Sequence, residues 1–73
     1  MKPSEIEVGA TYINRGAGRS KRKVIAVGPD CKPAQWLGFY KSEPNEDGVI
    51  FEQNGFVRRL YISSFAKWAG RRA

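Results

Sequence analysis

Apolar residues recur at every second position in several short stretches of this chain, the period expected of β-strands that bury one face. The spacing of these stretches predicts about five strands, over residues 6–14, 23–27, 35–40, 49–53 and 56–62. In the first strand the inward-facing side chains are those of Ile6, Val8, Ala10 and Tyr12. In the third, Gly38 marks a bulge or a close approach of two backbones.

Turn signals separate the predicted strands, and the clearest of them is Asn54-Gly55. This pair accepts the positive φ that a type I′ turn requires, so residues 49–62 are predicted to form a β-hairpin. A two-residue loop pairs Gln53 with Phe56, Phe51 with Arg58 and Val49 with Leu60. A bulged three-residue loop would shift that register, and the sequence leaves both open.

The apolar period changes near the C-terminus, where a short helix is expected. Its apolar face is formed by Phe65, Trp68 and Ala69, at positions i, i+3 and i+4. Ser63 or Ser64 can cap the first turn, and Gly70 stands at the C′ position. A helix this short is unstable alone, so we expect Phe65 and Trp68 to plug one open end of a β-barrel.

These elements together resemble an all-β, SH3-like barrel of about five strands with a short C-terminal helical turn. The segment Ile6-x-Val8-Gly9-x-x-Tyr12, followed by residues 23–28, resembles the opening of KOW-type modules. The overall pattern, including residues 60–70, is similar to small phage and prophage proteins. The resemblance implies a fold and a phage origin but no site residues. We expect one domain over residues 1–73, with flexible ends at 1–5 and 71–73.

Charge is segregated along the chain, which has a net charge of +6. Residues 15–23 carry five basic side chains and no acidic one, and residues 53–73 carry another five. Between them, residues 43–52 contain four acidic side chains. Segregation of this kind favours a polyanionic partner that meets one face of the molecule, although solubilising surface charge would also explain it.

The residue types present argue against catalysis, metal binding and a disulfide. The chain has no histidine and one cysteine, Cys31, so Ser-His and Cys-His pairs, a zinc site and an internal disulfide are all excluded. A lone thiol suits a reducing cytosol. The acidic residues Glu43, Glu46 and Asp47 are expected to be solvated around a turn, because their spacing does not match a calcium loop. We therefore predict a protein that is not an enzyme and has no cofactor.

The glycine-rich stretch 16–23 does not match a phosphate-binding P-loop, because the second glycine and the following helix are missing. No stretch approaches the ~20 apolar residues that a membrane span needs. The first residues also lack the apolar run of a signal peptide. The sequence therefore predicts a soluble, cytoplasmic protein, in the host cytoplasm if a phage encodes it.

The best candidate chemistry is phosphate binding by arginine and lysine, with an aromatic side chain for stacking. The predicted binding residues are Arg15, Arg19, Lys21, Arg22, Lys23, Arg58, Arg59 and Tyr61. The leading hypothesis is non-catalytic binding of nucleic acid or a nucleoprotein. Two alternatives remain: a phage-encoded interaction module that inhibits a host defence protein, and a phage structural or assembly accessory. No recognition helix is visible, so sequence-specific DNA binding is not expected.

Overall fold

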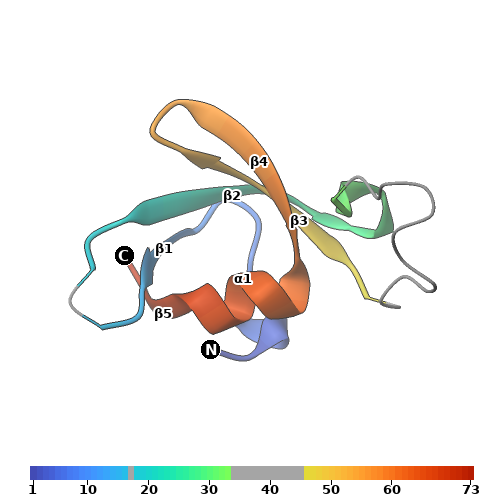
Figure 1. Cartoon of the computed structure of the whole chain (residues 1–73). Helices are drawn as coiled ribbons and strands as arrows, with labels where there is room; N and C mark the ends of the chain where they lie inside the picture. The colour runs from blue at the N-terminus through green and yellow to red at the C-terminus, as the bar shows by residue number, and fades with distance from the viewer. Residues whose placement is uncertain (17, 34–45) are drawn as a thin grey trace, which may run out of the picture.

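The computed structural model describes residues 1–16, 18–33 and 46–73, which form one antiparallel sheet and a short helix (Figure 1). The sheet has the order β4-β3-β2-β1-β5. Its strands are β1 (Thr11–Asn14), β2 (Lys21–Gly28), β3 (Gly48–Gln53), β4 (Phe56–Tyr61) and β5 (Ala69–Arg72). The helix is α1 (Ile62–Trp68), and two single 3₁₀ turns are η1 (Pro3–Glu5) and η2 (Pro29–Cys31). The predicted β-rich domain is confirmed at this level, but the described strands form an open sheet whose edges are β4 and β5.

The predicted hairpin is confirmed in its two-residue register. Gln53 pairs with Phe56, and the pairing continues without a shift to Gly48 and Tyr61. Asn54 has φ of 53° and Gly55 has φ of 82°, so both central residues take the positive values of a type I′ turn. This turn matches the twist of the flanking strands, which fixes which residues of β3 and β4 share a face.

The first strand is shorter than predicted. The sequence pattern suggested a strand over residues 6–14, whereas β1 begins at Thr11 because Gly9, at φ of 87°, turns the chain. Ile6 and Tyr12 are buried as expected, but Val8 is 61% exposed. The Tyr12 hydroxyl accepts a hydrogen bond from the Glu7 N–H and donates one to the Glu5 carbonyl, both at 2.8 Å. Those two bonds hold the N-terminal segment against the sheet, together with backbone hydrogen bonds from the Gly9 N–H to the Val24 carbonyl and from the Val24 N–H to the Ala10 carbonyl, both at 2.9 Å.

The fifth strand comes from a segment that the sequence pattern did not assign to the sheet. β5 pairs with β1, and both chain ends predicted to be flexible contain regular structure, η1 near the N-terminus and β5 near the C-terminus. The strand predicted over residues 35–40 lies outside the described residues. Gly70 follows the helix as predicted but lies in β5, where it packs against the Arg15 backbone.

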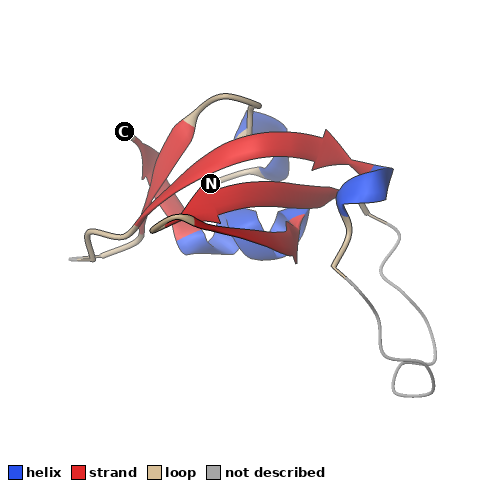
Figure 2. Ribbon diagram, turned by 90° about the horizontal axis from the view of Figure 1, so that it is seen from above, coloured by secondary structure: helices blue, strands red, loops and turns tan. Residues whose placement is uncertain are grey.

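The hydrophobic core lies between α1 and the face of the sheet that the helix covers, which we call the inner face (Figure 2). Phe65 is fully buried at its centre, with ring centroids 5.8 Å from Tyr12 and 5.3 Å from Phe51. Trp68 is only half-buried at the margin, 5.4 Å from Phe65. Phe65, and not Trp68, is therefore the main anchor of the helix. No helix in the described part of the chain is long and apolar enough to cross a membrane.

The N-terminus of α1 is capped by a side chain distant in sequence. The predicted caps, Ser63 and Ser64, lie inside the helix, and the N-cap residue Tyr61 makes no side-chain cap. Instead the Glu46 carboxylate accepts hydrogen bonds from the Ser63 N–H at 3.1 Å and the Ser63 hydroxyl at 2.6 Å. Glu46 is therefore a structural acceptor for an N–H group in the first turn of the helix. The prediction that Glu46 is solvated at a turn is wrong.

Candidate nucleic-acid interface

Two connections that are distant in sequence lie at the same end of the sheet. Lys23 pairs with Glu52, so the beginning of β2 lies beside the Asn54-Gly55 turn. The described part of the connection between β1 and β2, residues 15–16 and 18–20, therefore lies at this end as well (Figure 1). We call it the basic end, and six of the predicted binding residues lie there: Arg15, Arg19, Lys21, Arg22, Lys23 and Arg58. Arg71 lies at this end as well, because it pairs with Ile13, which also pairs with Lys21.

The acidic residues near β3 lie mostly at the opposite end. Glu46 and Asp47 precede Gly48, which pairs with Gly28 and Tyr61 at the far end of β2 and β4. Asp30 follows in η2, with Lys32 beside it. The charge segregation seen along the sequence thus becomes a partial separation of charge along the sheet, since Glu52 pairs with Lys23 at the basic end.

The connection between β1 and β2 is anchored at its base. The Asn14 Oδ1 accepts a hydrogen bond from the Ser20 N–H at 3.2 Å, and the Asn14 N–H donates to the Ser20 carbonyl. The Arg15 N–H donates to the Trp68 carbonyl at 3.0 Å, which joins the connection to the end of α1. Arg15 and Arg19 remain exposed beyond this base, so their side chains are free to meet a large anionic surface.

Strand alternation divides the basic residues between the two faces of the sheet. On β2, Val24 is buried in the core, so Arg22 shares the inner face, whereas Lys21 and Lys23 are exposed on the outer face. On β4, Arg58 pairs with the buried Phe51 and so lies on the inner face. The predicted basic segments therefore share one end of the molecule, and not one face.

Arg22 is held in a fixed position at the edge of the core. Its guanidinium carbon lies 4.1 Å from the ring centroid of Trp68 and 4.7 Å from that of Phe51. Its Nε donates a hydrogen bond of 2.9 Å to Gln53 Oε1. Burial, followed by the charge of Arg58, lowers the pKa of the Arg22 guanidinium below its usual value. Stacking of this kind fixes the orientation of a planar cation.

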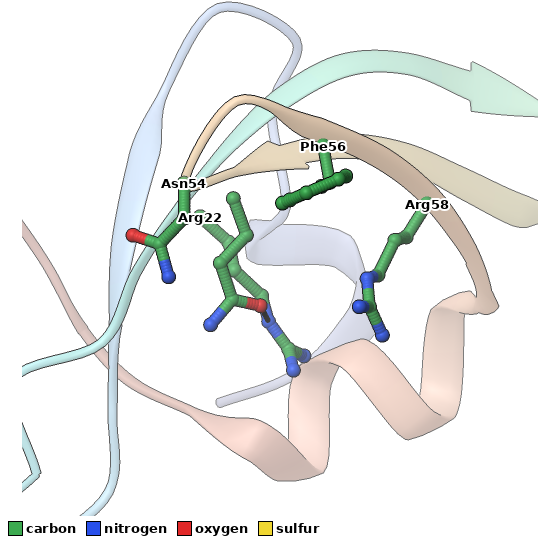
Figure 3. Close-up of a pocket in the computed structure, with 5 residues that line it drawn as sticks. Arg22, Asn54, Phe56 and Arg58 are labelled. Atoms are coloured by element: carbon green, nitrogen blue, oxygen red, sulfur yellow. Dashed lines mark hydrogen bonds between the residues drawn. The ribbon is translucent and has the colours of Figure 1, made fainter.

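A pocket of about 380 Å³ opens beside Arg22 under the hairpin (Figure 3). Its walls are formed by Arg22, Gln53, Asn54, Phe56 and Arg58. Figure 3 shows the Arg22 and Arg58 side chains both reaching from the strands toward α1. Phe56 is 66% exposed. The lining contains two cations, two amides and one aromatic ring but no carboxylate, which favours an anionic ligand with an aromatic part.

Two of the predicted binding residues lie away from this group. Arg59 is on the outer face, and its Nη1 donates a hydrogen bond of 3.1 Å to the Asp30 carbonyl toward the acidic end. Tyr61 is half-buried and pairs with Gly48 at that same end. The structure thus separates both residues from the other six.

Three pocket residues were missed by sequence reasoning: Gln53, Asn54 and Phe56. A signal for Phe56 was present, since the predicted register places it two residues before Arg58 on the same face of one strand. The sequence around Gln53 and Asn54 does not indicate a binding role, because their place in the pocket depends on the position of Arg22 across the sheet.

The described residues offer binding groups at the basic end and no assembled group of metal ligands. Among them, no three histidine, cysteine or acidic side chains are placed to hold a metal ion together. Searches of protein-family models, curated proteins and solved structures found no match to this chain. The arrangement of charge and aromatic side chains at the basic end is therefore what a functional proposal must rest on.

Proposed function

We propose that this chain is a non-catalytic domain that binds nucleic acid, free or within a nucleoprotein, through its basic end. The observation that carries the proposal is the convergence of six cationic side chains from β2, β4 and the β1–β2 connection. The only salt bridge among described residues joins Arg72 to Glu7, so none of these six is neutralised by an ion pair there. Although Glu52 is the cross-strand neighbour of Lys23, closely spaced cations that form no ion pairs attract a polyanion.

The mode of binding that this surface supports is recognition of the phosphate backbone. The helix α1 buries Phe65 and Ala66 in the core and has only seven residues. It offers no long polar face for the major groove, so base-specific duplex reading is not expected. Exposed arginine and lysine side chains position a backbone without reading its sequence.

We also propose that the chain has the fold of an SH3-like barrel. It is supported by the meander of β1 through β4, by the return of β5 to the edge of β1, and by a short helix between β4 and β5. Connections between strands commonly carry binding residues, and Arg15 and Arg19 of the basic end lie on such a connection.

The test is a titration of a labelled oligonucleotide, single-stranded and duplex, at several salt concentrations, followed by fluorescence anisotropy. Contact with about 4–5 phosphates gives a slope of log K against log salt near −4 on duplex DNA and somewhat less on single strands. If the purified domain binds neither form at low salt, the proposal is wrong.

A pair of exposed lysines provides a matched comparison for that experiment. Lys21 lies at the basic end, whereas Lys2 precedes η1 near the N-terminus, and both are exposed. Lys21→Glu should weaken binding to all sequences and reduce the salt slope by about one, because one phosphate contact is lost. Lys2→Glu makes the same charge change and should leave affinity almost unaltered. Equal effects of the two variants would show that net charge alone controls binding.

A protein partner is the second candidate, and two exposed apolar side chains favour it. Ile25 is 44% exposed and Val57 is 63% exposed, both on or near the outer face. Exposed apolar side chains on a sheet suit a protein surface better than a nucleic-acid backbone. An inhibitor of a host protein predicts a shallow salt dependence and recovery of one protein after nuclease treatment of the lysate.

A further inference from the structure

We infer that the pocket under the hairpin is a subsite for one unpaired nucleotide, with its phosphate between Arg22 and Arg58 and its base against Phe56. This inference rests on the proposed function and names its preferred ligand as single-stranded nucleic acid. The pocket residues come from β2, β3, the hairpin turn and β4, so the subsite exists only in the folded sheet.

The phosphate position follows from the two guanidiniums. Phe51, Trp68 and Gln53 fix the plane of Arg22. Beyond the Nε bond to Gln53, the Arg22 guanidinium donates no hydrogen bond to any described residue. Arg58 is exposed and lines the same pocket, and it is close enough to disfavour the charged form of Arg22. An anion between the Arg22 and Arg58 guanidiniums offsets that repulsion and accepts hydrogen bonds from both of them.

The base position follows from Phe56. This ring is 66% exposed on the inner face of β4, directly after the turn, although a phenylalanine is commonly buried. Aromatic rings that remain open beside cations are the stacking platforms of proteins that bind single strands. The amides of Gln53 and Asn54 line the same pocket and supply donors and acceptors for the edge of a base.

The pocket favours an unpaired nucleotide over a duplex. Its volume of about 380 Å³ is at the small end of the range for ligand sites, and residues of the hairpin form part of its lining (Figure 3). A base inside a duplex already stacks on both faces and cannot lie on a protein ring without being flipped out. Single strands present unstacked bases at no such cost.

The decisive comparison uses two neighbouring residues of β4. Phe56 and Val57 are 66% and 63% exposed but lie on opposite faces, so both tolerate truncation. With a short labelled oligothymidylate, Phe56→Ala should weaken binding about tenfold, and Val57→Ala should not. A duplex of the same length should bind both variants as it binds the unaltered chain.

A second pair tests the phosphate position. Arg58 lies on the inner face and lines the pocket, whereas Arg59 lies on the outer face and contacts the Asp30 carbonyl. Arg58→Gln should weaken binding of the oligothymidylate and reduce its salt slope by about 0.7, and Arg59→Gln should do neither.

The outcomes separate this inference from the proposed function. If the unaltered chain binds the oligothymidylate with a steep salt slope but Phe56→Ala and Arg58→Gln match their controls, the subsite is wrong and backbone binding stands. Loss of duplex binding by Phe56→Ala to the same extent would also overturn the preference for an unpaired base. If the unaltered chain binds no nucleic acid, the proposed function itself is wrong.

Discussion

Phe56 and Phe65 illustrate how position in the fold decides what one residue type does. Phe65 has no exposed surface and contacts the rings of Tyr12, Phe51 and Trp68. Phe56 leaves two thirds of its surface open at the edge of the pocket. Burial of a phenylalanine stabilises a fold by about 1.5–3 kcal/mol, and Phe56 forgoes most of that contribution. An aromatic ring left exposed beside cations is the arrangement that the proposed subsite requires.

Gly55 carries the prediction that belongs to a single residue. Its φ of 82° is costly for a side chain, although no atom lies within 4 Å of where a Cβ would stand. Gly55→Val should therefore destabilise the domain by about 1–2 kcal/mol through the backbone alone. Thermal unfolding measures this, at about 4–8 °C for each kcal/mol.

The control at the same position is Gly55→Asn, because asparagine adopts the left-handed conformation more readily. It should lower the melting temperature by less than Gly55→Val. Equal losses for the two variants would mean that the side chain is clashing, contrary to the open space around Gly55.

Among the elements, the hairpin is the part of the fold that local sequence determines. Asn54 and Gly55 select the turn, and the turn then sets every cross-strand pair from Gln53 to Gly48. The burial of Phe65 on α1 was predictable for the same reason, since the face of a helix depends on local geometry, but Ala69 of the predicted apolar face lies in β5 and not in the helix. Both predictions use interactions between residues close in sequence.

Features that depend on contacts between distant segments could not be predicted. Residues 69–72 have no strand-like alternation, and they become β5 because they meet the edge of β1. The alternation of apolar residues predicts a strand through Gly9, but the positive φ of Gly9 interrupts it. At the candidate site, six of the eight predicted residues lie at one end, but the pocket itself required knowing that Arg22 and Phe56 are on the same face.

The cap of α1 gives the prediction at the scale of an element. Glu46→Ala removes the acceptor of both the Ser63 N–H and the Ser63 hydroxyl. Loss of a helix cap costs about 0.5–2 kcal/mol, so the variant should unfold at a lower temperature with reduced helical signal in circular dichroism.

Asp47→Ala is the matched control for the cap. Asp47 precedes the same strand, but its contact with the helix is a backbone one, from the Ile62 N–H to the Asp47 carbonyl at 2.9 Å. That hydrogen bond survives truncation of the side chain, so a smaller loss is expected. A larger loss of stability for Asp47→Ala than for Glu46→Ala would show that the carboxylate of Asp47, and not that of Glu46, caps the helix.

In the whole molecule, the junction of β5 with the β1–β2 connection joins the end of the chain to the basic end. The Arg15 N–H donates to the Trp68 carbonyl, and Gly70 lies directly against the Arg15 backbone. A Cβ at Gly70 would lie 2.9 Å from the Arg15 Cα. Backbone atoms cannot rotate away as side chains do, so the contact requires glycine.

Gly70→Ala should therefore displace β5 from β1 and destabilise the domain by about 1–3 kcal/mol. Hydrogen exchange should report faster exchange at the Ala73 amide, which donates to the Thr11 carbonyl. Arg71→Ala, at the next and exposed position of the same strand, should leave that amide protected. If Gly70→Ala leaves exchange and stability unchanged, the close approach of the two backbones is wrong.

The pairing of β1 with β5 also orders events during folding. The hairpin of β3 and β4 closes across two residues. In contrast, Tyr12 can pair with Arg72 only after all four other strands have been synthesised. Closing so long a loop has a larger entropic cost and makes such pairings slow. In a ribosome-bound nascent chain, β1 would therefore remain an unpaired edge strand until β5 emerges. A chaperone that recognises unpaired strands would bind β1 at that stage.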